Sequence, residues 1–219
     1  MTVVPLGRLG DRGAARTMSL GALIDGEPGV RVRSAGLGQF SAALLRGAAS
    51  SQVAVYLDGV PLSRGAAGAL DLSQIPVDGL ERVEIYRGVP PLSLGPDAVG
   101  GAINLVSRRG AGPGRALSLS ASSGSFGLRK AAASYAERRG ALRAAASLSY
   151  EGATGDFPYY YTSGFVYSLE GHGELRRRND GFDQVSADLR LGYERGATSL
   201  RAEAHGTLRQ GGVAGAGQP

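Results

Sequence analysis

The sequence predicts an α+β domain followed by antiparallel transmembrane β-strands that form part of an outer-membrane β-barrel. Three observations support this fold class. The second half contains segments of about ten residues in which apolar and polar side chains alternate, as in strands that face lipid on one side and a lumen on the other. The first half mixes short helix-like and strand-like segments with turns. No run approaches the roughly 18–20 continuous apolar residues of a membrane helix.

The composition excludes several classes of functional site. The chain has no cysteine, which excludes disulfide scaffolds, thiolate metal sites and cysteine nucleophiles. His172 and His205 are the only histidines, so the chain has few side chains from which a histidine metal site or a Ser-His-Asp triad could be built. The net charge of +5 comes from scattered arginines, with Lys130 as the only lysine. We therefore expect no catalytic residue, metal, cofactor or nucleic-acid partner, and we expect that the protein is not an enzyme.

A short helix is predicted near the start of the chain, over residues 17–24. Leu20, Leu23 and Ile24 fall on one face of this helix, and Thr17 is expected to cap its first turn. Pro28-Gly29 then ends the segment.

Strands are predicted in the first half where apolar residues run together or alternate. Asp58-Gly59 separates two apolar runs and predicts a tight turn, in which Gly59 supplies a positive φ. Gly100-Gly101 precedes the last strand and permits two backbones to approach closely. The predicted strands cover residues 53–57, 60–62, 82–87 and 102–106.

The character of the sequence changes near residue 112. Gly112-Pro113-Gly114 resists any regular element and marks the boundary between the two halves. We predict a first domain over residues 1–111 and about five barrel strands over residues 112–219.

The alternation in the second half is strongest in residues 142–151, 185–194 and 200–208, and weaker in 116–122 and 128–137. A soluble antiparallel sandwich also alternates, but soluble strands average about five or six residues. Aromatic residues near the segment ends also favour a membrane strand, since barrels carry aromatic girdles there. Alternation fixes both faces of a strand at once. The expected lipid-facing residues are Leu142, Leu148, Leu189, Leu191 and Leu200, and the expected lumen-facing residues are Arg143, Asp188, Arg190, Arg201 and Glu203.

The connections between these segments predict the orientation of the strands. Residues 138–140 and 195–197 form very short turns, whereas residues 152–180 form a long connection. In outer-membrane barrels the periplasmic turns are short and the extracellular loops are longer. The two short turns are therefore expected on the periplasmic side.

Motifs of the first half resemble the plug domain of TonB-dependent outer-membrane receptors over about residues 3–109. They follow the family's order and approximate spacing, and the segment Gly124–Gly127 resembles the first outer loop of such barrels. The motifs are Ser19-Leu20, Pro28-Gly29-Val30, Leu45-Arg46-Gly47, Gln52–Leu62, Ile75-Pro76, Leu80–Gly88 and Leu94–Val106.

The resemblance implies roles for particular residues. In the family, arginines of Arg-Gly motifs pair with acidic side chains of the barrel wall, so Arg46 and Arg87 are expected to contact the barrel, with Glu84 as a third contact. The alternative is ordinary surface ion pairing, worth about 0–1 kcal/mol. The residues expected to form plug turns are Asp58, Gly59, Gly88, Gly100 and Gly101.

The long connection carries three aromatic residues in a row, Tyr159, Tyr160 and Tyr161. These side chains are candidate ligand contacts, because aromatic rings can stack on a bound solute. The alternative is that they anchor the loop at the membrane interface.

The resemblance implies a receptor of the cell outer membrane that takes up a scarce solute, such as a ferric siderophore or cobalamin, with the plug gating the lumen. Its implied partners are a TonB-type energising protein, outer-membrane lipid, and a metal chelate or other small solute. The alternative is a plug-like binding or signalling module that does not transport. Because plugged transporters use about 22 strands and the family places its TonB-contacting segment and signal peptide upstream of the plug, we expect this chain to be part of a longer receptor.

Overall fold

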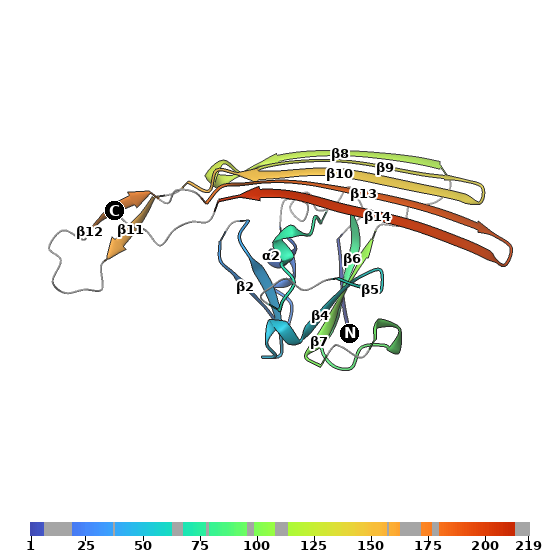
Figure 1. The fold of residues 1–219 in the computed structure, drawn as a ribbon, viewed down its shortest axis with the longest axis horizontal. Coiled ribbons are helices and arrows are strands. Elements are labelled where there is room, and N and C mark those ends of the chain that lie inside the picture. The colour runs from blue at the N-terminus through green and yellow to red at the C-terminus, as the bar shows by residue number, and fades with distance from the viewer. Residues whose placement is uncertain are drawn as a thin grey trace.

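The computed structural model describes residues 1–6, 19–36, 38–62, 68–77, 79–95, 99–107, 114–156, 158–162, 172–176 and 180–212. A small N-terminal part lies against one face of a long, curved antiparallel sheet (Figure 1). We call this face of the sheet the inner face and the opposite one the outer face. Among the described residues, no helix is long and apolar enough to cross a membrane.

A five-stranded sheet in the order β1-β6-β7-β4-β5 forms the centre of the N-terminal part. β4 and β7 pair in parallel, and the other neighbours pair antiparallel. The sequence predicted four of these strands and missed β1, whose four residues are too few to display a pattern. The strands are β1 (Thr2–Pro5), β4 (Val53–Leu57), β5 (Val60–Pro61), β6 (Leu80–Tyr86) and β7 (Gly101–Ser107).

A short helix and a β-hairpin cover one face of this sheet. The helix α2 (Leu20–Ile24) begins after Ser19, whose Oγ accepts a hydrogen bond of 3.2 Å from the backbone N–H of Ala22. The helix is therefore shorter than predicted, and the expected cap Thr17 lies outside the described residues. The hairpin of β2 (Val30–Ser34) and β3 (Ser41–Leu45) was not predicted from the sequence.

The hydrophobic core lies between this layer and the sheet. Leu20, Ile24 and Leu45 of the helix and hairpin are fully buried, as are Val83, Ile85, Ile103 and Leu105 of β6 and β7. Among the described residues of this part, 3₁₀ turns that connect the elements are η1 (Ser50–Gln52), η2 (Leu72–Gln74) and η3 (Leu92–Leu94). Burial of the apolar side chains of the helix, the hairpin, β6 and β7 stabilises the N-terminal part by about 1.5–3 kcal/mol each.

The second sheet contains five long strands in the order β14-β13-β10-β9-β8, all paired antiparallel. Each of the five segments predicted from the alternation lies within one of these strands. The one exception is Leu128, the first residue of the segment 128–137, which precedes β9 by one residue. A short turn, η4 (Ser125–Gly127), joins the first two strands. The strands are β8 (Gly114–Ser123), β9 (Arg129–Arg139), β10 (Leu142–Ala153), β13 (Phe182–Arg195) and β14 (Thr198–Gly211).

The long connection between β10 and β13 is not wholly irregular. It contains a two-stranded hairpin of β11 (Pro158–Thr162) and β12 (His172–Arg176), which extends beyond the end of the long sheet (Figure 1). The short turns that follow β9 and β13 both lie at the opposite end of the sheet (Figure 1). This arrangement matches the predicted orientation, with short turns on one side and the long connection on the other.

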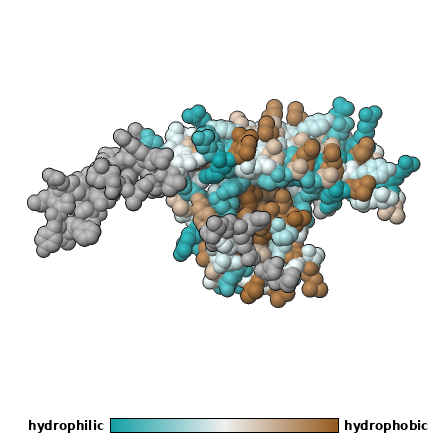
Figure 2. All heavy atoms as spheres, viewed as in Figure 1, coloured by the Kyte–Doolittle hydropathy of each residue, from teal (hydrophilic) through white to brown (hydrophobic). Residues whose placement is uncertain are grey.

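The two faces of the long sheet differ in chemistry as predicted. Large apolar side chains on the outer face are exposed, among them Leu142 (60%), Leu189 (48%) and Leu200 (65%). Across the strand pairs, Leu189 lies opposite the small residues Ala146 and Ala204, and both Leu142 and Leu200 lie opposite Tyr193. Figure 2 shows such apolar side chains recurring along the sheet between polar ones. An exposed apolar face of this extent is suited to contact with lipid.

A labelling experiment tests this assignment of the faces. Leu189→Cys and Arg190→Cys place a thiol at neighbouring positions of β13, and the chain has no other cysteine. In membranes, a charged maleimide should label Arg190→Cys at least tenfold faster than Leu189→Cys, because lipid excludes the reagent. The same maleimide should label both variants at similar rates after denaturation. Equal rates in the folded state would contradict the assignment.

Candidate functional site at the interface between the N-terminal part and strand β13

The inner face of β13 carries the contacts between the sheet and the N-terminal part. Alternate residues of β13 from Phe182 to Arg190 point to this face, since side chains alternate along a strand, and Asp180 precedes the strand by two residues. The first of them are covered by the N-terminal part: Asp180, Phe182 and Gln184 are each 4% exposed and Ser186 is 1% exposed. We call this row, Asp180, Phe182, Gln184, Ser186, Asp188 and Arg190, the β13 row.

The tip of the β2–β3 hairpin rests on the first part of the β13 row. Gly38 packs directly on the ring of Phe182, and a Cβ atom at Gly38 would lie 2.0 Å from that ring. The guanidinium of Arg209, on β14, lies 4.7 Å from the centre of the same ring and donates a hydrogen bond to the carbonyl oxygen of Gly38. A cation over an aromatic face is attracted by the ring quadrupole. Glycine is thus required at the hairpin tip, where φ is +63°.

Two glutamines add hydrogen bonds between the N-terminal part and the β13 row. Nε2 of Gln39, next to the hairpin tip, donates to Oδ1 of Asp180 at 2.7 Å. Nε2 of Gln184 donates to the backbone carbonyl oxygen of Gln74, in η2, at 3.3 Å. Oε1 of Gln184 accepts a hydrogen bond from Arg209 at 2.9 Å. Gln184 therefore has both its donor and its acceptor occupied while it is buried, as a stable buried amide requires.

The last part of the β13 row forms a charged cluster against Gly79. Oδ2 of Asp188 accepts a hydrogen bond from Ser147 at 3.0 Å, and Oδ1 lies 2.8 Å from Nδ1 of His205 and 3.6 Å from the guanidinium of Arg190. A Cβ at Gly79 would lie 3.4 Å from Asp188 and 3.5 Å from Arg190, which is ordinary van der Waals contact. The cluster thus leaves room for a small side chain at position 79 but not for a large one.

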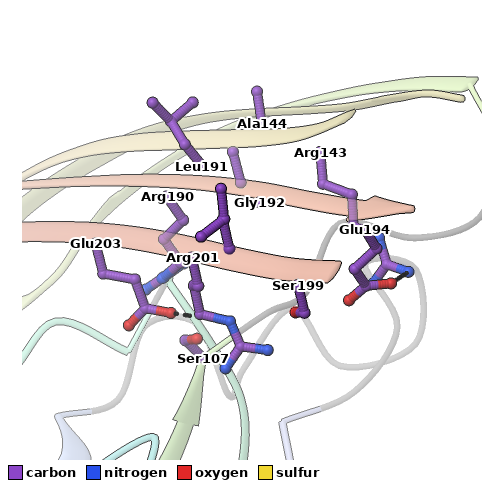
Figure 3. A pocket seen from close by; sticks show the side chains of 12 residues that line it. Ser107, Arg143, Ala144, Arg190, Leu191, Gly192, Glu194, Ser199, Arg201 and Glu203 are labelled. Carbon is purple, nitrogen blue, oxygen red and sulfur yellow. Dashed lines mark hydrogen bonds and ion pairs between the residues drawn. The ribbon is translucent and has the colours of Figure 1, made fainter. Parts of the chain in front are cut away.

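Beyond this cluster, a cavity of about 60 Å³ separates the end of β7 from the inner face. Figure 3 shows Arg190, Arg201 and Glu203 pointing toward Ser107, whereas Leu191 and Ala144 point away to the outer face. The charges in the lining are largely paired, with Arg143 2.6 Å from Glu194 and Arg201 3.9 Å from Glu203.

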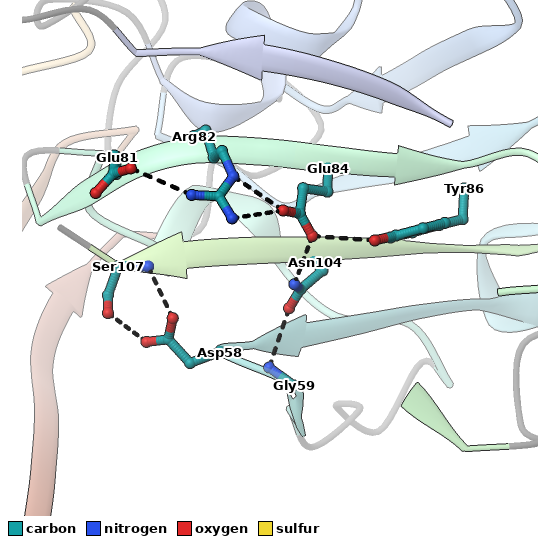
Figure 4. A network of polar contacts seen from close by, with 8 residues as sticks. All are labelled: Asp58, Gly59, Glu81, Arg82, Glu84, Tyr86, Asn104 and Ser107. Carbon is teal, nitrogen blue, oxygen red and sulfur yellow. Dashed lines mark hydrogen bonds and ion pairs between the residues drawn. The ribbon is translucent and has the colours of Figure 1, made fainter. Parts of the chain in front are cut away.

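A polar network leads from Ser107 through the N-terminal sheet (Figure 4). The carboxylate of Asp58 accepts hydrogen bonds from the backbone N–H of Ser107 at 3.1 Å and from its hydroxyl. Also on β7, Oδ1 of Asn104 accepts a hydrogen bond from the N–H of Gly59 at 3.1 Å, and Nδ2 of Asn104 donates to Glu84 on β6 at 2.9 Å. The network ties the β4–β5 turn to β7 and β6.

Glu84 is the centre of this network. Its carboxylate accepts hydrogen bonds from Arg82 at 2.9 Å and from the Tyr86 hydroxyl at 3.1 Å, besides the one from Asn104. Partial burial favours the protonated acid, but these three hydrogen bonds outweigh burial and hold the pKa of Glu84 below its usual value of 4.5. Burial and the neighbouring carboxylate raise the pKa of Tyr86.

A pH titration tests the stabilising role of Glu84. A carboxylate whose pKa is lowered by folding stabilises the folded state above its unfolded pKa and loses this contribution as the pH falls through its folded pKa. We expect the urea midpoint of the N-terminal part, followed by hydrogen exchange in detergent, to fall between pH 6 and pH 3. In Glu84→Gln the midpoint should be lower at pH 6 and should fall less. An identical pH dependence in both proteins would contradict this role.

The structure places the predicted turn residues as follows. Asp58 and Gly59, with φ of +50° and +85°, are the two central residues of the β4–β5 hairpin turn, in the conformation that such turns favour. A Cβ at Gly100 would lie 2.7 Å from Ala48, and a Cβ at Gly101 would lie 2.5 Å from the carbonyl oxygen of Tyr86. Gly88 has no neighbouring atom within 4 Å of the position of such a Cβ.

Arg46 and Arg87 lie together at Gly29, at the open end of the β2–β3 hairpin. A Cβ at Gly29 would lie 3.4 Å from Arg87 and 3.7 Å from Arg46, and the hydroxyl of Thr2 accepts a hydrogen bond from Arg87. Nε and Nη2 of Arg87 are buried without a hydrogen-bond partner among the described residues. The tip of this hairpin lies at the long sheet and its open end points away from it (Figure 1). Pairing of these arginines with the barrel wall stays a prediction, as does a contact of Glu84 with the wall.

The three candidate ligand contacts, Tyr159, Tyr160 and Tyr161, lie on β11, but their side chains are outside the described part of the structure. Within the described residues, no group of three or more acidic, histidine or cysteine side chains is placed to hold a metal ion. The sequence did not identify Asp180, Phe182, Gln184 and Ser186 of the β13 row as contacts, nor their partners Gly38, Gln39, Gln74 and Gly79. The alternation in residues 185–194 placed Asp188 and Arg190 on the inner face, and it is the one sequence signal that pointed to this interface.

A small mixed domain seated on the inner face of long antiparallel strands, with leucines on the outer face, defines a class of protein: a plugged outer-membrane β-barrel, of which this chain contains a part. Comparison with known families agrees. Residues 1–102 match the family described as TonB-dependent Receptor Plug Domain. The first half of this chain is therefore a TonB-dependent receptor plug region, which we call the plug. The protein is a protein of the Gram-negative outer membrane.

Curated relatives match the same region. The chain is 36% identical over 94 residues to the vitamin B12 transporter BtuB of Photobacterium profundum, which covers 43% of this chain and 16% of the relative. It is 38% identical over 81 residues to the vitamin B12 transporter BtuB of Vibrio cholerae, covering 36% of this chain and 13% of the relative. The chain thus spans about a sixth or less of the length of these relatives.

Solved structures resemble the chain over both halves. The ferric enterobactin receptor PfeA of Pseudomonas aeruginosa has a TM-score of 0.67 at 18% identity, covering 95% of this chain and 32% of that one. The ferric yersiniabactin uptake receptor FyuA of Yersinia pestis has a TM-score of 0.66 at 19% identity, covering 95% and 31%. These similarities establish the fold, which is a plug followed by strands of an outer-membrane barrel.

Proposed function

We propose that this chain is the plug and adjoining wall of a receptor for energy-coupled uptake of a scarce solute across the outer membrane. In this proposal residues 1–111 are the plug domain and residues 112–219 supply about the first five strands of the wall. The relatives are named as vitamin B12 transporters, and structural neighbours as receptors for ferric chelates or as a copper transporter. A metal chelate or cobalamin is accordingly the solute class that we propose.

The observation that carries the proposal is the β13 row. The row is polar apart from Phe182, yet its first four residues are at most 4% exposed, because the plug covers them. Among the described residues, its contacts with the plug include hydrogen bonds from Gln39 and to Gln74, and the packing of Gly38 on the ring of Phe182. Hydrogen bonds of this kind contribute about 0.5–1.5 kcal/mol each and can be exchanged for bonds to water. Such an interface can hold the plug in register and still open under an applied force.

Arg46 and Arg87 support a second set of contacts on the side of the plug away from β13. Arg46 is exposed, whereas Nε and Nη2 of Arg87 are buried without a partner among the described residues. A buried guanidinium with free donors is costly unless it is paired. We propose that acidic side chains on further wall strands pair with these arginines, and that a TonB-type protein acts on the plug from the periplasm. Glu84, inside the network of β6 and β7, would transmit strain between the two sides of the plug.

Uptake in cells tests this function. The full-length receptor that carries this region is expressed in a strain that lacks its own cobalamin and siderophore receptors. Uptake of radiolabelled cobalamin or of a ferric siderophore should appear, and it should disappear when the TonB-type protein is deleted, while binding at the cell surface persists. Arg87→Ala should leave binding within about twofold and alter uptake.

Two outcomes would contradict the proposal. One is uptake that is equal with and without the TonB-type protein. The other is binding without any uptake under either condition, which would favour a binding or signalling module.

A further inference from the structure

Two arginines and a glutamate lie on the outer face of the long sheet, at the end with the short turns. Arg115 of β8 stands opposite Glu137 of β9, and Arg139 of β9 stands opposite Leu142 of β10. Because Leu142 is on the outer face and side chains alternate along each strand, all three charged side chains lie on that face. By the orientation of the turns, this end lies on the periplasmic side. We call Arg115, Glu137 and Arg139 the rim cluster.

The two ends of the outer face differ in charge among the described residues. At the periplasmic end, Arg195 of β13 joins the rim cluster, so three arginines stand against one glutamate and the formal charge is +2. At the opposite end, Arg129 of β9 and Asp183 of β13 give a formal charge of zero. The periplasmic end of the lipid-facing surface is therefore the one that attracts anions.

Glu137 orients Arg115 and leaves most of its donors unused. Nε of Arg115 donates to Oε1 of Glu137 at 3.1 Å, and the hydroxyl of Tyr135 donates to Oε2 at 2.8 Å. Both carboxylate oxygens are thus occupied, whereas the terminal nitrogens of Arg115 make no hydrogen bond with the described residues, and its side chain is 72% exposed. The side chain of Arg139 is also exposed and makes no hydrogen bond or ion pair with the described residues. Two guanidinium groups are therefore ready to bind an anion.

The spacing of these two arginines suits a single phosphate group. Arg139 follows the cross-strand partner of Arg115 by two residues, so the two arginines are diagonal neighbours on one face. Diagonal neighbours in an antiparallel pair lie about 7–8 Å apart. Long side chains at this spacing can approach one phosphate from two sides, and each guanidinium presents parallel N–H donors that match phosphate oxygens.

The outer face is also hollowed along the same strands. A groove of about 430 Å³ has Ala133 of β9 in its lining, between Leu119 of β8 and Leu148 of β10. Ala133 is four residues from Glu137, which is about 14 Å along a strand. With a strand tilt of about 35–45°, this is roughly 10–11 Å of membrane depth, close to half of an apolar band about 25 Å tall. An acyl chain that starts at the rim cluster therefore reaches the groove.

We propose that the rim cluster and this groove form a docking surface for an anionic phospholipid of the periplasmic leaflet. Its phosphate lies between Arg115 and Arg139, and one of its acyl chains lies in the groove. A zwitterionic headgroup brings a cation of its own, so the formal charge of +2 favours a headgroup with a net negative charge. A soluble phosphate would leave the groove empty, whereas a lipid fills both parts. The surface concerns how the wall is held in the membrane and does not depend on the solute.

Lipid retention by the full-length receptor that carries this region tests the inference. The delipidated receptor in detergent is mixed with equal amounts of phosphatidylglycerol and phosphatidylethanolamine, and bound lipids are identified by native mass spectrometry. One arginine near an anionic lipid is worth about fivefold in binding. We expect phosphatidylglycerol to be retained at least threefold over phosphatidylethanolamine. This preference should fall at least threefold in Arg115→Gln combined with Arg139→Gln.

The matched control removes the same charge elsewhere. Arg31→Gln combined with Arg33→Gln changes two exposed arginines of β2, in the plug, and should leave the lipid preference unchanged. Free glycerol phosphate at the concentration of the lipid should not displace phosphatidylglycerol, because it cannot occupy the groove.

Glu137→Gln gives a result that misfolding cannot imitate. The substitution removes a negative charge beside the expected phosphate and releases Arg115 from its ion pair, so the preference for phosphatidylglycerol should rise at least twofold. Four outcomes would each overturn the inference: an unchanged preference in the Arg115 and Arg139 variant, an equal loss in the Arg31 and Arg33 control, no rise in Glu137→Gln, or displacement of the lipid by glycerol phosphate.

Discussion

Gly101→Ala should destabilise the plug by about 3 kcal/mol or more. Gly101 has a φ of +119°, and an added Cβ would lie 2.5 Å from the carbonyl oxygen of Tyr86 and 2.8 Å from the side chain of Leu45. Unfavourable φ costs on the order of 1–3 kcal/mol, and overpacking adds a similar amount. The carbonyl belongs to β6, which pairs with β7, so relief of the contact would separate two central strands. Hydrogen exchange of the β6 and β7 amides in detergent measures the effect.

Gly88→Ala is the matched control for this prediction. Gly88 lies just after β6, is exposed, and has open space around the position of a Cβ. The alanine variant should exchange its amides at the same rate as the unaltered protein, within about 0.5 kcal/mol. If the two variants were equally stable, the close approach of backbones at Gly101 would not be a structural requirement.

Gly79→Leu should release the plug from the wall, whereas Gly79→Ala should not. A Cβ at Gly79 makes ordinary contacts of 3.4–3.6 Å with Asp188, Arg190 and Ser147, but leucine adds three carbons where those groups lie. Overpacking of this kind costs about 1–3 kcal/mol. We expect limited proteolysis of the plug to accelerate about tenfold in Gly79→Leu and to change less than twofold in Gly79→Ala.

The control for the leucine substitution is Gly26→Leu. Gly26 is exposed, and nothing lies within 4 Å of the position of its Cβ. The rate of proteolysis should therefore stay close to that of the unaltered protein. Rapid proteolysis in both leucine variants would point to a general loss of plug stability and against a specific contact at Asp188.

Local patterns in the sequence were sufficient to predict much of the fold. The strand over residues 53–57 and the turn at Asp58-Gly59 depend on neighbouring residues only, and both are present. The five wall strands follow from alternation, which any two-faced strand displays over its whole length. The β2–β3 hairpin was missed because its turn region has no Asn-Gly or Asp-Gly signal, and its arginines alternate with valines in a segment of only five residues.

The interface could not be predicted in the same way, because it joins residues far apart in the chain. Gly38 and Arg209 are 171 positions apart, and Gln74 and Gln184 are 110 positions apart. Their contacts use a glycine, a backbone carbonyl and amide side chains, none of which has a distinctive sequence pattern. The motif residues Arg46 and Arg87 are easier to identify in the sequence, but they lie at the open end of the hairpin, remote from its tip at Phe182.

Cross-linking of the hairpin tip to the wall tests the central claim, that residues 1–102 are a plug seated on the β13 row. Nε2 of Gln39 lies 2.7 Å from Oδ1 of Asp180, and the chain has no native cysteine. In outer membranes, Gln39→Cys combined with Asp180→Cys should cross-link nearly completely with a short bis-thiol reagent. Gln39→Cys combined with Leu189→Cys, on the outer face, should not cross-link. Equal and low cross-linking of both pairs in folded protein would contradict the account.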